Sequence, residues 1–391
     1  MKIFNKKTKK IAILLFVMVI CFCFPLLCGC SNESFSKMIA NAEKGDVVLL
    51  EKDMTCDDEI FVNQDLTLDL GARMLTLQKP IVIKSGATLT VKNGNVNGSG
   101  DFDCLFKTEG KLVVNGAIIK ASGNTNGITN LGETQVDGGT IAGYYGIANS
   151  GNLVVDDGTI YTTQQEPNGY AIKNTGTAII KNGIVGESKI NPNYGTIYFT
   201  PGIENYGKVV IENGQIGSVY SQGNNAKAYF YGGKIMESVH IIGGYAETED
   251  KKGNLVFAGS SPFDVLEGTA VIKGGVFTDL YDEHHASTGA IVSFHGTVSV
   301  YGGSFCETEM SGVVNVYGGT FNNSVEIIPT STVKFMGGTF KKGAKIAEHT
   351  NQIIQQLIFN LHDVLEAGYK FSIAIDKTAK ETTQEFSVVI E

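Results

Sequence analysis

One short motif recurs along most of this chain and limits what the chain can fold into. Each copy has an apolar residue, two turn-forming residues and a glycine, and Asn, Asp or Gly usually stands just before that glycine. From Gly94 to Gly338, eleven steps cover 244 residues, about 22 residues a step, when a degenerate copy at Phe257–Ser260 is counted. Such a period is typical of a solenoid, whose coils bury their apolar side chains by stacking on one another. The clearest copies are Val91–Gly94, Val113–Gly116, Val136–Gly139, Val155–Gly158, Ile180–Gly183, Ile211–Gly214, Phe230–Gly233, Ile272–Gly275, Val300–Gly303, Val316–Gly319 and Phe335–Gly338.

A second motif lies at a constant distance from the first. In four copies an asparagine precedes the turn glycine by nine residues, which predicts one strand of fixed length between two fixed corners. Differences in coil length then fall elsewhere in the coil. Because neighbouring strands are about 4.8 Å apart, we expect these asparagines to stack as a ladder with a structural role. They are Asn130, Asn149, Asn174 and Asn205.

The residues around these motifs alternate between apolar and polar, which indicates short β-strands. Asn-Gly pairs are also frequent in hairpins, so an antiparallel meander or sandwich is the alternative fold. We favour the parallel arrangement, because hairpins would not keep both the nine-residue interval and one motif orientation. On these motifs, residues 47–340 resemble the pectate-lyase-like right-handed parallel β-helix superfamily, particularly its bacterial surface-protein branch. The resemblance implies an all-β solenoid and says little about function.

The two ends of a solenoid are open sheet edges that need to be covered. Apolar residues at helical spacing between Phe35 and Ala42, followed by Gly45, predict a short cap helix within residues 30–46. At the other end, apolar residues over 353–361 predict a helix, and a strand over 356–361 followed by a short helix over 363–367 is the alternative. Residues 371–375 and 386–390 alternate like paired strands. We therefore expect 341–391 to form a C-terminal cap or a small α+β appendage.

The first 29 residues have the composition of an export signal. Five lysines precede an apolar run from Ile11 to Leu27, which is short for a membrane-spanning helix. The segment Leu27-Cys-Gly-Cys30 resembles a bacterial lipoprotein signal, which implies that residues 1–29 are removed and that Cys30 carries a lipid. Residues 30–46 would then hold the lipidated cysteine, a tether and the cap helix. A plain N-terminal anchor and a non-lipid signal peptide are the alternatives, and all three export the protein.

Charge excludes one large class of partners. Without the five signal lysines, 26 basic residues face 40 acidic ones, and the formal charge changes from −9 to about −14. Such an acidic body, in which Arg73 is the single arginine, argues against binding to nucleic acid. It also argues against electrostatic attachment to a membrane, so the lipid would hold the protein there. Cys56, Cys104 and Cys306 are too scattered for a disulfide framework or a metal site.

Enzyme sites of the superfamily have few counterparts in this sequence. Resemblance to pectate lyases would imply acidic Ca²⁺ ligands beside an Arg or Lys base, but Arg73 has no acidic partner at repeat spacing. Resemblance to polygalacturonases would imply a Gly-His-Gly motif, which is incomplete at Phe294–Gly296. One constellation remains, because the outward position after the apolar residue carries Asp137, Asp156 and Lys181 on successive coils. Paired carboxylates can hold Ca²⁺, and a desolvated lysine can act as a base. The alternative is an ordinary solvated face.

Two further groups are candidates for binding. In later coils the same outward position carries Tyr231, Tyr301 and Tyr317, which could form a strip that binds sugar or protein, or could simply cover neighbouring chain. A long insertion has carboxylates and imidazoles at a density typical of metal sites, although its spacing matches no known motif and a solvated loop is the alternative. Its candidate ligands are Asp279, Asp282, Glu283, His284 and His285.

These observations predict a lipid-anchored protein of the cell membrane or cell surface, whose β-helix is a rigid binding or adhesion module. The ligand would be a surface glycan or a host or matrix protein. A polysaccharide lyase or glycoside hydrolase and a structural envelope component are the alternatives, and the sequence favours binding over catalysis. We expect a monomer without a cofactor, or with Ca²⁺ if the protein is lyase-like.

Overall fold

The computed structural model describes residues 34–98, 100, 102–164, 169–190, 197–259, 261–278, 291–323, 325–328, 331–341, 346–348, 365–372 and 386–390. The chain divides into two compact units, Met1–Asn41 and Ala42–Glu391. The described part of the first unit contains helix α2 (Phe35–Asn41), with Phe35 and Ile39 buried. The predicted helix is therefore confirmed, while its capping role stays a prediction. Among the described residues, no helix is long and apolar enough to span a membrane.

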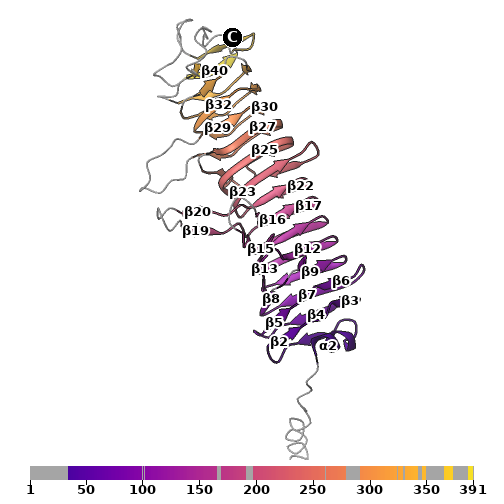
Figure 1. Cartoon of the computed structure of the whole chain (residues 1–391). Helices are drawn as coiled ribbons and strands as arrows, with labels where there is room; N and C mark the ends of the chain where they lie inside the picture. Colours follow the sequence, from indigo (N-terminus) through magenta and orange to yellow (C-terminus); the bar gives the residue numbers. More distant parts are fainter. Residues whose placement is uncertain are drawn as a thin grey trace, which may run out of the picture. The chain divides into compact units, whose positions relative to one another are not determined.

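The second unit is a β-solenoid of about 12 turns, as predicted. Equivalent strands of successive coils pair in parallel and form three ladders, which Figure 1 shows as strands lying above one another. Ladder A contains β1 (Val47–Leu49), β4 (Leu66–Asp69), β7 (Thr88–Lys92), β10 (Lys111–Asn115), the first parts of β13 (Glu133–Gly143) and β15 (Asn152–Thr162), β17 (Thr177–Ile180), β22 (Lys208–Ile211), β24 (Lys227–Phe230), the last parts of β25 (Lys234–Thr248) and β27 (Ser261–Ile272), β30 (Thr297–Val300), β33 (Val313–Val316) and β36 (Thr332–Phe335).

Ladders B and C complete each coil. Ladder B contains β2 (Met54–Cys56), β5 (Met74–Leu77), β8 (Asn95–Gly98), β11 (Ile118–Ala121), the last parts of β13 and β15, β18 (Ile184–Val185), the first parts of β23 (Gln215–Gln222) and β25, β26 (Val256–Phe257), β28 (Val276–Phe277), β31 (Ser304–Phe305), β34 (Thr320–Phe321) and β37 (Thr339–Phe340). Ladder C contains β3 (Ile60–Val62), β6 (Ile81–Ile83), β9 (Cys104–Thr108), β12 (Asn126–Asn130), β14 (Ile147–Asn149), β16 (Ile172–Asn174), β21 (Ile203–Asn205), parts of β23, β25 and β27, β29 (Ile291–Phe294), β32 (Glu307–Met310), β35 (Val325–Ile327) and β38 (Ile346–Glu348).

Alternate residues of each strand point inward and build the core. The apolar residue of the first motif is fully buried, as in Val136, Val155 and Ile180. One inward column of ladder B is aliphatic in the earlier coils and becomes aromatic from Phe257 onward. From there, rings of successive coils stack with centroids 4.7 to 5.1 Å apart. Many of the chain's 21 phenylalanines therefore fill the core, where stacking adds to the burial of apolar surface.

The asparagine ladder is confirmed. The four side chains are buried and lie opposite one another on consecutive coils. Each amide nitrogen donates to the side-chain oxygen of the next, at 2.6 Å from Asn130 to Asn149, and 2.7 Å from Asn149 to Asn174 and from Asn174 to Asn205. The series ends where Asn205 donates to Ser221 Oγ at 3.0 Å. Each amide also donates to a backbone carbonyl of the following coil, so it fixes the corner before ladder A.

Antiparallel strand pairing departs from the solenoid pattern at two places in the described part of the chain. Strands β19 (Ser188–Ile190) and β20 (Ile197–Phe199) form a hairpin, and Phe199 N donates to Glu237 Oε1 of β25 at 2.8 Å. At the C-terminus, β39 (Tyr369–Phe371) pairs with β40 (Phe386–Ile390), and β40 also pairs with β37. The strand predicted over 386–390 is confirmed, and it covers an edge that would otherwise be unpaired. The helix predicted over 353–361 lies outside the described residues.

Asn174→Ala tests the ladder. The substitution leaves Asn149 Nδ2 and Asn205 Oδ1 without their buried partners, so we expect the free energy of unfolding to fall by about 2 to 4 kcal/mol. Denaturant unfolding followed by circular dichroism measures the change. Asn182→Ala is the matched control, because Asn182 is exposed and its side chain accepts one hydrogen bond, from Asn213 at 3.3 Å, among the described residues. Equal losses in both variants would contradict a special role for the buried ladder.

Candidate functional site

The structure brings together the three residues that the sequence nominated for catalysis. Lys181 Nζ lies 2.8 Å from Asp156 Oδ1. Gln135 Nε2 donates to Asp137 Oδ1 at 2.8 Å and to Asp156 Oδ2 at 3.1 Å. A register shift between β13 and β15 places Asp157, and not Asp156, opposite Asp137. The two carboxyl groups are therefore offset in register, but they bind the same amide, and both Lys181 and, more weakly, Asp137 lie close enough to lower the pKa of Asp156.

The electrostatics of this group favour a fixed ion pair. The hydrogen bond from Lys181 lowers the pKa of Asp156 below its usual value, and the same hydrogen bond raises the pKa of Lys181. Lys181 therefore keeps its proton at neutral pH, which is unfavourable for a general base. Within the described ranges, no group of three or more His, Cys, Asp or Glu side chains has an arrangement that could hold a metal ion.

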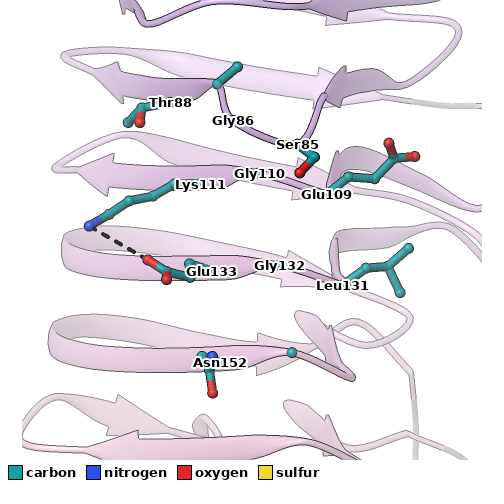
Figure 2. Close-up of a pocket in the computed structure, with 12 residues that line it drawn as sticks. Ser85, Gly86, Thr88, Glu109, Gly110, Lys111, Leu131, Gly132, Glu133 and Asn152 are labelled. Atoms are coloured by element: carbon teal, nitrogen blue, oxygen red, sulfur yellow. Dashed lines mark ion pairs between the residues drawn. The ribbon is translucent and has the colours of Figure 1, made fainter.

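A shallow hollow of about 460 Å³ crosses the corner between ladders C and A (Figure 2). Backbone at Gly110 and Gly132 forms part of its floor. No side chain fits at Gly132, because a Cβ there would lie 2.3 Å from the carbonyl oxygen of Gly110. Lys111 and Glu133 line it and form a 3.9 Å ion pair, and with Asn152 they also line a second hollow of about 310 Å³ on ladder A. Both charged side chains are largely exposed, so their pair contributes little to stability or binding.

The three nominated tyrosines do not form one strip. Tyr301 and Tyr317 stack in parallel with ring centroids 4.7 Å apart, and both are exposed. Two coils separate them from Tyr231 along the ladder. Tyr231 instead lies near Tyr229, and Lys251 Nζ lies 3.4 Å from its ring centroid.

Several nominated residues lie outside the described part of the chain. These are the lipidation candidate Cys30 and the metal-ligand candidates Asp279, Asp282, Glu283, His284 and His285. Their roles stay predictions.

The richest cluster of polar and aromatic side chains lies on the outer side of ladder C, where the sequence nominated nothing. Five of its members are register partners on successive coils, running from Lys173 on β16 to Asp264 on β27. Three tyrosines and a glutamine from adjoining segments complete it. We call this cluster the tyrosine face and define it as Tyr145, Tyr170, Lys173, Glu204, Tyr206, Tyr220, Gln222, His240 and Asp264.

Glu204 is the centre of one half of the tyrosine face. Its Oε1 accepts from the Tyr206 hydroxyl at 3.0 Å and from Gln222 Nε2 at 3.1 Å, and its Oε2 lies 3.9 Å from Lys173 Nζ. The same ammonium lies 5.3 Å from the ring centroid of Tyr145 and 6.0 Å from that of Tyr206. The carboxylate is thus surrounded by donors, and the lysine is held over two aromatic rings.

A chain of ring contacts forms the other half. Tyr170 packs edge-on against Tyr220 at 5.6 Å between centroids, and Tyr220 packs on His240 at 4.6 Å. His240 Nδ1 lies 3.2 Å from Asp264 Oδ2. Burial, followed by the neighbouring Tyr220, raises the pKa of Tyr170, and burial also raises the pKa of Tyr145. These hydroxyls therefore keep their protons at neutral pH and can donate hydrogen bonds.

A weak signal of this face is present in the sequence. Lys173 and Glu204 are the middle residues of the Ile-x-Asn motif, and the side chain of that residue points outward. Tyr220 and His240 occupy the same position in later coils, where Ser221 and Ile241 replace the asparagine. Because these later coils lack the asparagine, the sequence motif no longer identifies the outward position that Tyr220 and His240 occupy.

Comparisons of the chain with protein-family models, with curated proteins and with solved structures found no match.

Lys181→Met tests the ion pair on ladder A. Because the pKa of Asp156 is lowered in the folded protein, the pair stabilises it above the usual aspartate pKa of about 3.9, and this contribution is lost as pH falls through the lowered value. We expect a fall of about 1 °C in the unfolding temperature at pH 7 and a smaller one below pH 4. Lys111→Met is the matched control, with no expected change. A deficit that stays constant down to pH 3 would contradict the assignment.

Proposed function

We propose that this protein is a binding module and that it holds a glycan on the tyrosine face. The observation that supports this best is the convergence of Tyr145, Tyr170, Tyr206 and Tyr220 around Glu204. Aromatic rings offer apolar surfaces for the faces of sugar rings, and tyrosine hydroxyls other than that of Tyr206, which donates to Glu204, can donate to sugar hydroxyls. Carboxylate, amide and ammonium groups beside them match the hydroxyl groups of a saccharide.

The ladder gives such a face a second advantage. Its side chains project from parallel strands whose positions are fixed by the backbone pairing on both sides. Hydrogen bonds to Glu204 further restrict Tyr206 and Gln222. A preorganised face loses little conformational entropy when a ligand binds, so weak contacts add up to a usable affinity. Successive coils repeat these contacts about every 4.8 Å, which suits an extended polymer.

We also propose that the protein is exported and that a lipid on Cys30 anchors it to the cell membrane. Support comes from the lysine-rich start, the short apolar run and the Leu27–Cys30 segment. Membership of the pectate-lyase-like superfamily is likewise a proposal, supported by the parallel solenoid and its repeat. In this arrangement the lipid holds the protein at the membrane, and the solenoid presents the tyrosine face to ligands.

Tyr206→Ala tests the binding site. The substitution removes an exposed ring and a donor to Glu204, so we expect the affinity for a bound glycan to fall about tenfold. A glycan array with the full chain identifies the ligand, and titration calorimetry measures the change. Tyr301→Ala is the matched control, since Tyr301 is also exposed but lies on ladder A. Absence of binding to every glycan, or an equal loss in both variants, would refute the proposal.

Cys30→Ser tests the anchor. If Cys30 carries the lipid, the variant should lose labelling by radioactive palmitate in a bacterial host and leave the membrane fraction, because the acyl chains provide the attachment. Cys306→Ser is the control and should stay labelled and membrane-bound. Retained labelling in Cys30→Ser would rule out this site.

A further inference from the structure

The charged groups of the tyrosine face are arranged unevenly. In each of its two pairs the anion is the more buried partner: the side chain of Glu204 is 13% exposed against 39% for Lys173, and that of Asp264 is 11% exposed against 19% for His240. Glu204 already accepts hydrogen bonds from two neutral donors and pairs with the charge of Lys173. A ligand therefore meets the cationic partners first, although the protein as a whole is acidic.

Asp264 depends on His240 to an unusual degree. The residue is 7% exposed, and one carboxylate oxygen lies 3.2 Å from His240 Nδ1. The other oxygen is buried and accepts no hydrogen bond from any residue that the structure describes. A buried carboxylate without donors is costly unless a positive charge lies beside it. The His240 imidazole is therefore the neighbouring group that can supply this carboxylate with a positive charge.

The other groups around His240 do not replace this partner. On the side of β23, Tyr220 places its ring against the imidazole, which favours a cation over the ring face. Beyond it, Tyr170 packs on Tyr220, and Glu204 lies one further coil away. On β27, Glu267 is exposed and pairs in register with Ile242. Within β25, Glu237 accepts from the backbone of Phe199.

We propose that the tyrosine face takes a saccharide bearing carboxylate or sulfate groups, and that the His240–Asp264 pair makes this binding tighter at mildly acidic pH. The inference rests on the proposed function, because it concerns the same face. When His240 is neutral, the ionised Asp264 leaves one negative charge that repels an anionic ligand. A proton on the imidazole, the side chain whose charge most readily changes near neutral pH, cancels this charge. A neutral saccharide is insensitive to the change.

Dextran sulfate and unmodified dextran are the probes, since they share a backbone and differ in their sulfate groups. With the full chain, calorimetry at pH 5.5 and 7.5 should give an affinity for dextran sulfate about fivefold higher at the lower pH, and weaker, pH-independent binding of dextran. His240→Gln should bind dextran sulfate equally at both pH values. His295→Gln is the matched control and should keep the wild-type difference, because His295 faces Glu309 at 3.6 Å on a later coil.

Asp264→Asn provides a test that loss of folding cannot imitate. Removing the carboxylate removes the repulsion, so binding of dextran sulfate at pH 7.5 should rise toward the wild-type value at pH 5.5. Equal wild-type affinity at both pH values, a retained difference in His240→Gln, or tighter binding of poly-L-glutamate than of dextran sulfate would overturn the inference. Binding of neutral glycans alone would overturn it and leave the proposed function intact. No binding of any glycan would refute the proposed function itself.

Discussion

The hydrogen bonds that join Asn130, Asn149, Asn174 and Asn205 set the register on which the middle of the solenoid depends. Each amide donates two hydrogen bonds to the following coil. One goes to a side chain, which is the next asparagine or, for Asn205, Ser221, and the other goes to a backbone carbonyl. A slip of one residue in ladder C would break both bonds and bury polar groups without partners. The corner before ladder A is therefore fixed, and the coils differ in length only in their other connections.

Parallel backbone pairing, both within the asparagine ladder and beyond its end, turns single positions into columns. Inside the solenoid this produces the stack of phenylalanine rings that begins at Phe257. Outside, it produces the run from Lys173 to Asp264, in which each side chain faces its partner on the next coil. The same geometry that packs the core therefore concentrates functional groups, because any residue placed at one outward position acquires neighbours about 4.8 Å away on both sides.

This geometry also explains what the sequence could and could not predict. The repeat, the asparagine ladder and the strand at 386–390 follow from local patterns, so the sequence alone predicts them. The tyrosine face depends on contacts between coils of different length: 16 residues separate Glu204 from Tyr220, 20 separate Tyr220 from His240, and 24 separate His240 from Asp264. Register shifts between β25 and β27 alter the spacing further. No constant interval in the sequence marks these residues. Only the pairing of strands on successive coils shows that they lie together.

The ladder A group was identifiable for the opposite reason, since Asp137, Asp156 and Lys181 each lie two residues before the turn glycine of the motif. Its side chains satisfy one another on an exposed surface, where an ion pair is screened by water. On ladder C the anions are more buried, and one oxygen of Asp264 lacks a donor within the described residues. A polar group left in that state stores an unfavourable energy that a proton or a ligand can relieve. The tyrosine face therefore differs from the ladder A group in having a buried polar group whose hydrogen bonds are incomplete. This difference, more than the density of charged residues, makes it the functional candidate.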